Sequence, residues 1–94
     1  EAELFPRAIL VVDDVEQAIT IGDTQHPVGR GLMRPEQIHA TLGEILAGRK
    51  KGRTRRDEIT LFDATGLAFQ DLIAGHLAVK LAEERGLGIR VRMF

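Results

Sequence analysis

The segment from Glu58 to Asp71 constrains the fold of this chain more than any other. A short run of β-branched and apolar residues meets a polar turn at Asp63–Gly66, and the residues that follow are typical of a helix. A strand that opens directly into a helix brings the strand's carboxyl end and the helix amides to one spot, as at the ligand crevices of open α/β sheets. The segment therefore predicts an α/β fold with a crevice that suits a polar or anionic ligand.

Length and composition limit the class of protein. Ninety-four residues suffice for one small domain, and 44% hydrophobic with 29% charged residues is an ordinary globular composition. A formal net charge of -1 gives no general attraction to nucleic acid or membranes, and the absence of cysteine excludes disulfides and thiolate chemistry, which fits a cytoplasmic protein. The three histidines have no metal-binding spacing, so we expect no metal site.

The first half of the chain predicts one buried strand and two helices. Ala8–Val12 is a continuous apolar run, as in a strand covered on both faces, and Asp14 is placed to cap a helix over Val15–Ile21. Asp23–Arg34 is interrupted by proline and glycine, which predicts a loop. Pro35–Ala47 carries apolar residues at helical spacing, which predicts a helix.

The second half predicts two more strands around a long helix. Glu58–Asp63 is the strand before the turn, and for the turn itself the residues favour a strand end with Thr65 as helix N-cap. The helix that follows runs to about Arg85, and its apolar residues spread around the wheel, which predicts that other structure encloses it. Ile89–Phe94 alternates apolar and cationic residues like a half-exposed strand. Two strands of the buried type need more parallel neighbours, so we expect part of a larger sheet.

The segment Arg49–Arg56 is strongly basic, with six cations in eight positions. It is open to three interpretations: a solvated loop, a patch for a 2′-phosphate or nucleic acid, or a contact for an acidic partner. The solvated loop is favoured, because a patch without aromatic residues on a nearly neutral chain is weak support for nucleic-acid binding.

Two motifs in this order resemble the C-terminal third of the ornithine cyclodeaminase and mu-crystallin family. The first is Ile-His-Ala-Thr-Leu-Gly-Glu over residues 38–44, and the second is Phe-Asp-Ala-Thr-Gly-Leu-Ala-Phe-Gln-Asp over residues 62–71. With the preceding Val-Val-Asp-Asp, the similarity covers nearly the whole chain. It implies one partial domain over residues 1–94: the C-terminal half of a Rossmann-type, NAD(P)-binding domain, a three-layer αβα arrangement with parallel strands that is incomplete alone. Residues 67–94 would return toward a substrate and dimerisation domain.

The resemblance also implies a function and a site. Members of the family are typically homodimeric and use NAD or NADP to cyclise or deaminate ornithine, interconvert alanine and pyruvate, or reduce cyclic ketimines. The turn would lie against the nicotinamide end of the cofactor, which makes Asp63, Ala64, Thr65 and Gly66 the candidate cofactor-binding residues. Thr65 would also lie near the substrate. Ala64 stands where the family usually has serine, so one side-chain hydrogen bond is lost.

The family's other functional parts are not found in these 94 residues. No Gly-x-Gly-x-x-Gly fingerprint occurs, and the family's catalytic aspartate would lie just before Glu1. We therefore expect no catalytic residue here, no activity from the chain alone, and association with an N-terminal half or with further copies. The alternative is a non-catalytic α/β module that self-associates through strand edges and apolar helices. Nucleic-acid binding through the basic segment ranks below both.

Overall fold

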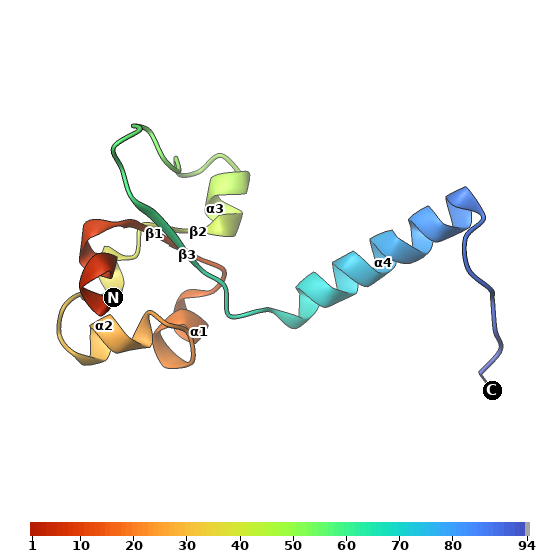
Figure 1. The fold of residues 1–94 in the computed structure, drawn as a ribbon, viewed down its shortest axis with the longest axis horizontal. Coiled ribbons are helices and arrows are strands. Elements are labelled where there is room, and N and C mark those ends of the chain that lie inside the picture. The colour runs from red at the N-terminus through yellow and green to blue at the C-terminus, as the bar shows by residue number, and fades with distance from the viewer. Residues whose placement is uncertain (94) are drawn as a thin grey trace.

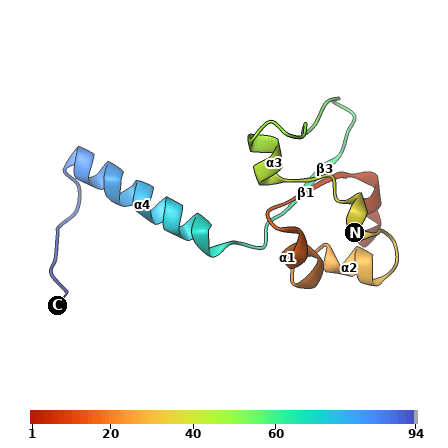
Figure 2. The same ribbon diagram turned by 180° about the vertical axis from the view of Figure 1, so that it is seen from behind.

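The computed structural model describes residues 1–93. A three-stranded parallel sheet is surrounded by short helices, and one long helix extends away from it (Figure 1 and Figure 2). The α/β class and the parallel strands predicted from the sequence are confirmed. The elements in chain order are η1 (Ala2–Arg7), β1 (Ile9–Val12), α1 (Val15–Thr20), α2 (Gln25–Gly29), η2 (Pro35–Gln37), β2 (Ala40–Thr41), α3 (Leu42–Leu46), β3 (Thr60–Asp63) and α4 (Ala68–Arg85).

The register of the sheet aligns the carboxyl ends of all three strands. The strand order is β2-β1-β3, with β1 in the centre. Val12, the last residue of β1, lies opposite Thr41 of β2 and opposite Asp63 of β3. Because the strands are parallel, the residues that follow each of them emerge at the same edge of the sheet.

The core lies on one face of β1. Leu10 and Val12, two residues apart and therefore on the same face, pack with Ala18 of α1 and with Met33. The predicted start of α1 is confirmed, since the Asp14 carboxylate accepts a hydrogen bond of 2.8 Å from the N–H of Gln17. In Figure 1, α1 and α2 lie below the sheet and α3 lies above it.

The predicted helix over Pro35–Ala47 is wrong, because the segment divides into η2, β2 and α3. The cause is a capping box at Thr41. The N–H of Glu44 donates to the Thr41 hydroxyl at 3.2 Å, and the N–H of Thr41 donates to the Glu44 carboxylate at 2.8 Å. This reciprocal pair fixes the start of the helix at Leu42 and leaves Ala40 free to pair with Val11.

The predicted loop over Asp23–Arg34 contains a short helix, α2. Pro27 is the third residue of that helix, in the first turn, where its missing N–H breaks no intrahelical hydrogen bond. Its ring is fully buried. Proline and glycine here shape a compact helical turn instead of an irregular loop.

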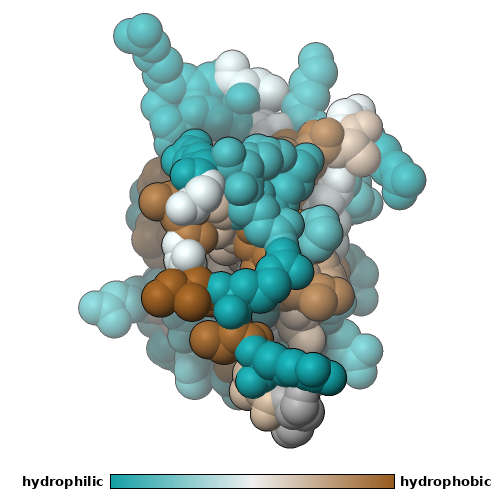
Figure 3. Space-filling view, turned by 90° about the vertical axis from the view of Figure 1, so that its right-hand side faces the viewer, coloured by the Kyte–Doolittle hydropathy of each residue, from teal (hydrophilic) through white to brown (hydrophobic). Residues whose placement is uncertain are grey.

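The C-terminal part agrees with the prediction in its helix, while the enclosure predicted for that helix is not found within residues 1–93. Helix α4 ends at Gly86 as expected, but none of its residues is buried within residues 1–93, and Leu72 is 73% exposed. Apolar side chains are visible at the surface when the molecule is viewed from the α4 side (Figure 3). No helix of the described residues has the length and apolarity that crossing a membrane requires.

The predicted strand over Ile89–Phe94 is wrong for residues 89–93, which have no regular structure. A strand needs a neighbour for its backbone groups, and no strand of the described residues lies beside this segment. Ile89 is 91% exposed. Phe94, the last residue of the prediction, lies outside the described residues.

Candidate functional site

The carboxyl edge of the sheet borders a hollow of about 400 Å³. Each strand supplies part of its wall: Asp13 follows β1, Thr41 ends β2 and Ala64 follows β3. Helices α3 and α4 add the apolar side chains of Leu42, Leu46 and Phe69. Because the carboxyl ends of the three strands are aligned, the residues there line one apolar hollow. Open parallel sheets bind ligands at this edge.

The Asp63–Gly66 turn presents alternate residues to this edge. Ala64 and Gly66 are exposed, whereas Asp63 and Thr65 are half-buried. Gly66 has φ of 83°, in the left-handed region that favours glycine, and it redirects the chain from β3 toward α4. The turn therefore offers a methyl group and main-chain atoms to a ligand, while its polar side chains point into the protein.

Asp63 is bound to the connection between α1 and α2. Its Oδ2 accepts hydrogen bonds from the N–H of Thr24 at 2.8 Å and from the Thr24 hydroxyl at 2.6 Å, and Thr24 is fully buried. Gly22 passes close by, because a Cβ at this position would lie 2.7 Å from Asp63 Oδ2 and 2.8 Å from Thr65 Cγ2. A side chain at residue 22 would therefore displace the turn.

Thr65 and Gly66 are bound to the end of β1. The Thr65 hydroxyl lies 2.8 Å from Asp13 Oδ1 and 3.0 Å from Gln17 Oε1, and the Gly66 N–H donates to Asp13 Oδ2 at 2.8 Å. The predicted N-cap role of Thr65 is wrong. Helix α4 begins at Ala68, its N-cap position is Leu67, and the Thr65 hydroxyl is used across the sheet edge instead.

The Asp13 carboxylate is stabilised in its ionised form. Burial raises the pKa of Asp13, but hydrogen bonds from Thr65, Gly66 and Asp14 together outweigh this effect and hold the pKa below its ordinary value of 3.8. A charged acceptor therefore lies beneath the turn at neutral pH. Among residues 1–93, no group of three histidine, cysteine or acidic side chains is arranged to hold a metal ion.

The sequence pattern predicts the turn but not the residues that support it. Asp13 carried a usable signal, because it follows an apolar strand directly and the adjacent Asp14 already accounts for the helix cap. Thr24 carried none, since its position depends on α2, which the local pattern did not predict. The apolar walls were missed because Leu42 and Leu46 were assigned to a single long helix.

The basic segment is bonded largely to its own neighbours. The Glu58 carboxylate accepts hydrogen bonds from the N–H of Thr54 at 2.7 Å and of Arg55 at 2.9 Å, and these bonds, with that of Arg55 first, keep the pKa of Glu58 below its usual range. The Arg55 guanidinium contacts Asp57 at 3.2 Å. The segment is thus a surface loop that is bonded to its own neighbours and, through Lys50 and Lys51, to His39.

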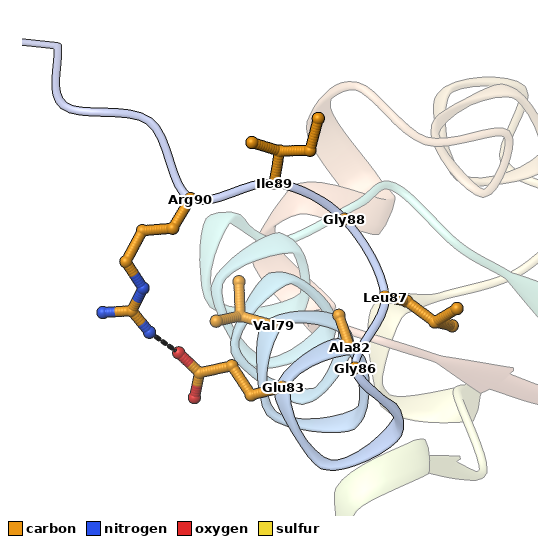
Figure 4. A pocket seen from close by; sticks show the side chains of 8 residues that line it. All are labelled: Val79, Ala82, Glu83, Gly86, Leu87, Gly88, Ile89 and Arg90. Atoms are coloured by element: carbon orange, nitrogen blue, oxygen red, sulfur yellow. Dashed lines mark hydrogen bonds and ion pairs between the residues drawn. The ribbon is translucent and has the colours of Figure 1, made fainter.

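A second hollow lies at the far end of α4 (Figure 4). Its walls come from the last turns of the helix and the segment that folds back over them, where Arg90 pairs with Glu83. Both partners of this ion pair are exposed. None of the candidate site residues contributes to this hollow.

Comparison with known proteins gives consistent sequence matches. The model of the ornithine cyclodeaminase/mu-crystallin family matches residues 1–85. The alanine dehydrogenase of Archaeoglobus fulgidus is 39% identical over 94 residues, which covers 100% of this chain and 29% of that protein. A Delta(1)-pyrroline-2-carboxylate reductase of Bacillus cereus is 43% identical over 83 residues, covering 87% of this chain and 26% of the reductase. The chain thus spans less than a third of these relatives.

Solved structures match the fold over nearly the whole chain. An archaeal alanine dehydrogenase dimer with bound NAD gives a TM-score of 0.83 at 39% identity, covering 100% of this chain and 29% of that one. The Thermococcus litoralis Delta(1)-pyrroline-2-carboxylate reductase, in complex with NADH and L-proline, gives 0.84 at 42% identity, covering 97% and 28%. The three-stranded sheet and its helices therefore correspond to part of NAD-binding enzymes.

Proposed function

Because this chain belongs to the ornithine cyclodeaminase/mu-crystallin family, we propose that it is the cofactor-side, C-terminal portion of an NAD(P)-dependent enzyme. The enzyme would act on a small amino acid or imino acid, as an ornithine cyclodeaminase, alanine dehydrogenase or ketimine reductase does. One observation carries the proposal: the Asp63–Gly66 turn exposes main chain and a methyl group beside an apolar hollow at the carboxyl edge of a parallel sheet. Relatives of the same fold hold NAD or NADH.

The residues at the edge fit the nicotinamide end of such a cofactor. Leu42 and Phe69 offer apolar surface to a flat ring, and Ala64 offers main-chain groups to its amide. Asp63 and Thr65 belong to the same site but use their side chains to hold the turn, so their contact with the cofactor would be through the backbone. The nicotinamide, when bound, supplies or accepts a hydride.

The substrate side of the proposal rests on Thr65 and on parts outside these residues. Within the turn, Thr65 is the residue whose side chain reaches the end of β1. We place this residue nearest to the substrate. The dinucleotide fingerprint and the catalytic groups would come from the remainder of the enzyme, so the isolated chain is expected to be inactive. Residues 67–94 would run toward a substrate and dimerisation domain, whose contact would cover the apolar surface of α4.

The proposal is tested by cofactor binding to the complete protein. At 100 times its Kd, NADH or NADPH should stabilise the fold by about 2.7 kcal/mol, which raises the melting temperature by roughly 5 °C. Ala64→Asp places a carboxylate in the hollow and should abolish that rise, whereas Ala47→Asp, at an exposed position, should preserve it. A melting temperature unmoved by both cofactors would overturn the proposal.

A non-catalytic self-associating module is the second candidate, and one observation favours it. Large apolar side chains are exposed on α4 and on the edge strand β3, including Leu72, Leu77 and Phe62. This candidate predicts a dimer or higher oligomer that binds no nucleotide. Light scattering of the complete protein with and without NADH separates the two, because a monomer would overturn self-association and a cofactor-dependent melting temperature would favour the enzyme.

A further inference from the structure

We propose that Asp13 is a positioning residue that holds the Asp63–Gly66 turn in the shape its cofactor requires. The inference rests on the proposed function and deepens it, because it assigns the geometry of the turn to a side chain that directly follows a different strand, β1. Asp13 itself would not touch the reacting atoms. It would act through Thr65 and Gly66, to which it is hydrogen-bonded.

The two oxygens of the Asp13 carboxylate have separate partners. Oδ2 accepts from the Gly66 N–H at 2.8 Å. Oδ1 accepts from the Thr65 hydroxyl at 2.8 Å and from the Asp14 N–H at 2.9 Å. One side chain therefore fixes two consecutive residues of the turn, and the bond to its own neighbour fixes the carboxylate.

The turn needs this support because few of its own side chains can restrict its backbone. Ala64 has no polar side chain, and Gly66 is the most permissive residue for backbone rotation. Leu67, at the N-cap of α4, provides no side-chain hydrogen bond to the helix. Asp63 is fixed by Thr24 on the other side, so the turn is held by two carboxylates, one at the end of β3 and one directly after β1.

An ionised carboxylate suits this task better than an amide. Hydrogen bonds to a charged acceptor are stronger than neutral ones, and both oxygens of a carboxylate accept. The amide of asparagine has one acceptor and one donor, so Asp13→Asn would set an NH₂ group against either the Gly66 N–H or the Asp14 N–H, which now donate to separate oxygens of the carboxylate. The depressed pKa of Asp13 agrees with a group that stays ionised.

The test measures hydrogen exchange in the turn and the Kd for NADH, both in the complete protein. In Asp13→Asn, we expect faster hydrogen exchange at peptides that contain Gly66 and a Kd for NADH raised about tenfold, the factor for a competent turn populated one-tenth of the time. Saturating NADH should restore slow exchange. Asp14→Asn is the matched control, because Asp14 caps α1 without contacting the turn, and it should change neither quantity.

A second pair of variants keeps the test decisive if Asp13→Asn folds poorly. Thr65→Val removes the hydroxyl and should shift exchange and the Kd in the same direction, whereas Thr20→Val removes a hydroxyl that bonds only within α1 and should leave both unchanged. Normal NADH affinity and slow exchange in both Asp13→Asn and Thr65→Val would overturn this inference only. Failure of the unsubstituted protein to bind NADH or NADPH would overturn the proposed function instead.

Discussion

Residues 1–66 and residues 67–93 are ordered by different means. The first region buries a core around Leu10 and Val12 and bonds segments that are distant in sequence: Thr24 and Asp63 are 39 positions apart, and Asp13 and Gly66 are 53 positions apart. In the second region no residue is buried, and its ion pairs, such as Lys80–Glu84, join near neighbours in sequence. The turn and the carboxylates that hold it therefore lie in the region that has tertiary contacts of its own, whereas the second region adds only part of the wall of the hollow, with Phe69.

The two regions therefore differ in the source of their stability: the first has its own core, and the second needs contacts from elsewhere. A helix gains most of its stability in proteins from packing an apolar face, and α4 has the apolar residues without the packing. Its contacts are expected from the rest of the complete protein. Substitutions in the complete protein can separate the two regions by their effects on the free energy of unfolding.

The largest effect is expected in the core of the first region. Leu10→Ala should lower the free energy of unfolding by about 3 kcal/mol, because Leu10 is 1% exposed and the neighbouring strands cannot close the cavity. Denaturant titration measures this. Leu46→Ala is the control at 78% exposure, and an equal loss there would contradict the assignment of the core.

The next effect is expected beneath the turn. Gly22→Ala should cost about 2 kcal/mol, since the new methyl would overlap Asp63, Thr65 and the backbone of Ala18. Gly29→Ala is the matched control, because no atom lies within 4 Å of the added methyl. Equal stability of the two variants would show that the turn tolerates displacement.

A smaller effect should appear on α4 if other parts of the protein cover it. Leu72→Ala is then expected to cost about 1 kcal/mol, more than the 0.5 kcal/mol within which exposed substitutions usually fall. Lys80→Ala, on the same helix, provides the exposed comparison. A cost for Leu72→Ala no larger than that for Lys80→Ala would mean that α4 stays exposed in the complete protein.

The smallest effect concerns pH. The folded pKa of Asp13 lies below its ordinary value of 3.8, so its ionised form adds stability above that pH and the contribution is lost as pH falls through the folded value. The stability difference between the unsubstituted protein and Asp13→Asn should be constant near pH 7 and shrink below pH 3.8. A difference that does not shrink as the pH falls below 3.8 would contradict the role of the ionised carboxylate.

Local patterns predicted the parts of the fold that depend on local chemistry. The apolar run of β1, the Asp14 cap and the long helix after Gly66 each have a signal within a few residues, and each is found in the structure. The turn was located for the same reason. The prediction that the turn binds NAD(P) came from the resemblance to the family, because the four residues of the turn do not by themselves identify a cofactor.

The remaining features depend on partners that are distant in sequence. Strand β2 is two residues long and forms because Ala40 and Thr41 pair with Val11 and Val12 of β1. The sequence around Ala40 cannot predict this pairing, because the partners are 29 positions away. The Thr41–Glu44 capping box was present in the sequence and would have corrected the helix boundary. Thr65 was assigned to a helix cap because its true acceptor, Asp13, is 52 residues away.

The separation of Asp13 from Gly66 has a consequence for the order of folding. Contacts between residues 53 positions apart require closure of a long loop, whereas the bonds of α4 form between near neighbours. A complete chain that refolds can therefore form α4 early, but it cannot shape the Asp63–Gly66 turn until β3 has docked beside β1. The binding edge is thus a late product of folding, and appearance of NADH binding during refolding would report completion of the sheet.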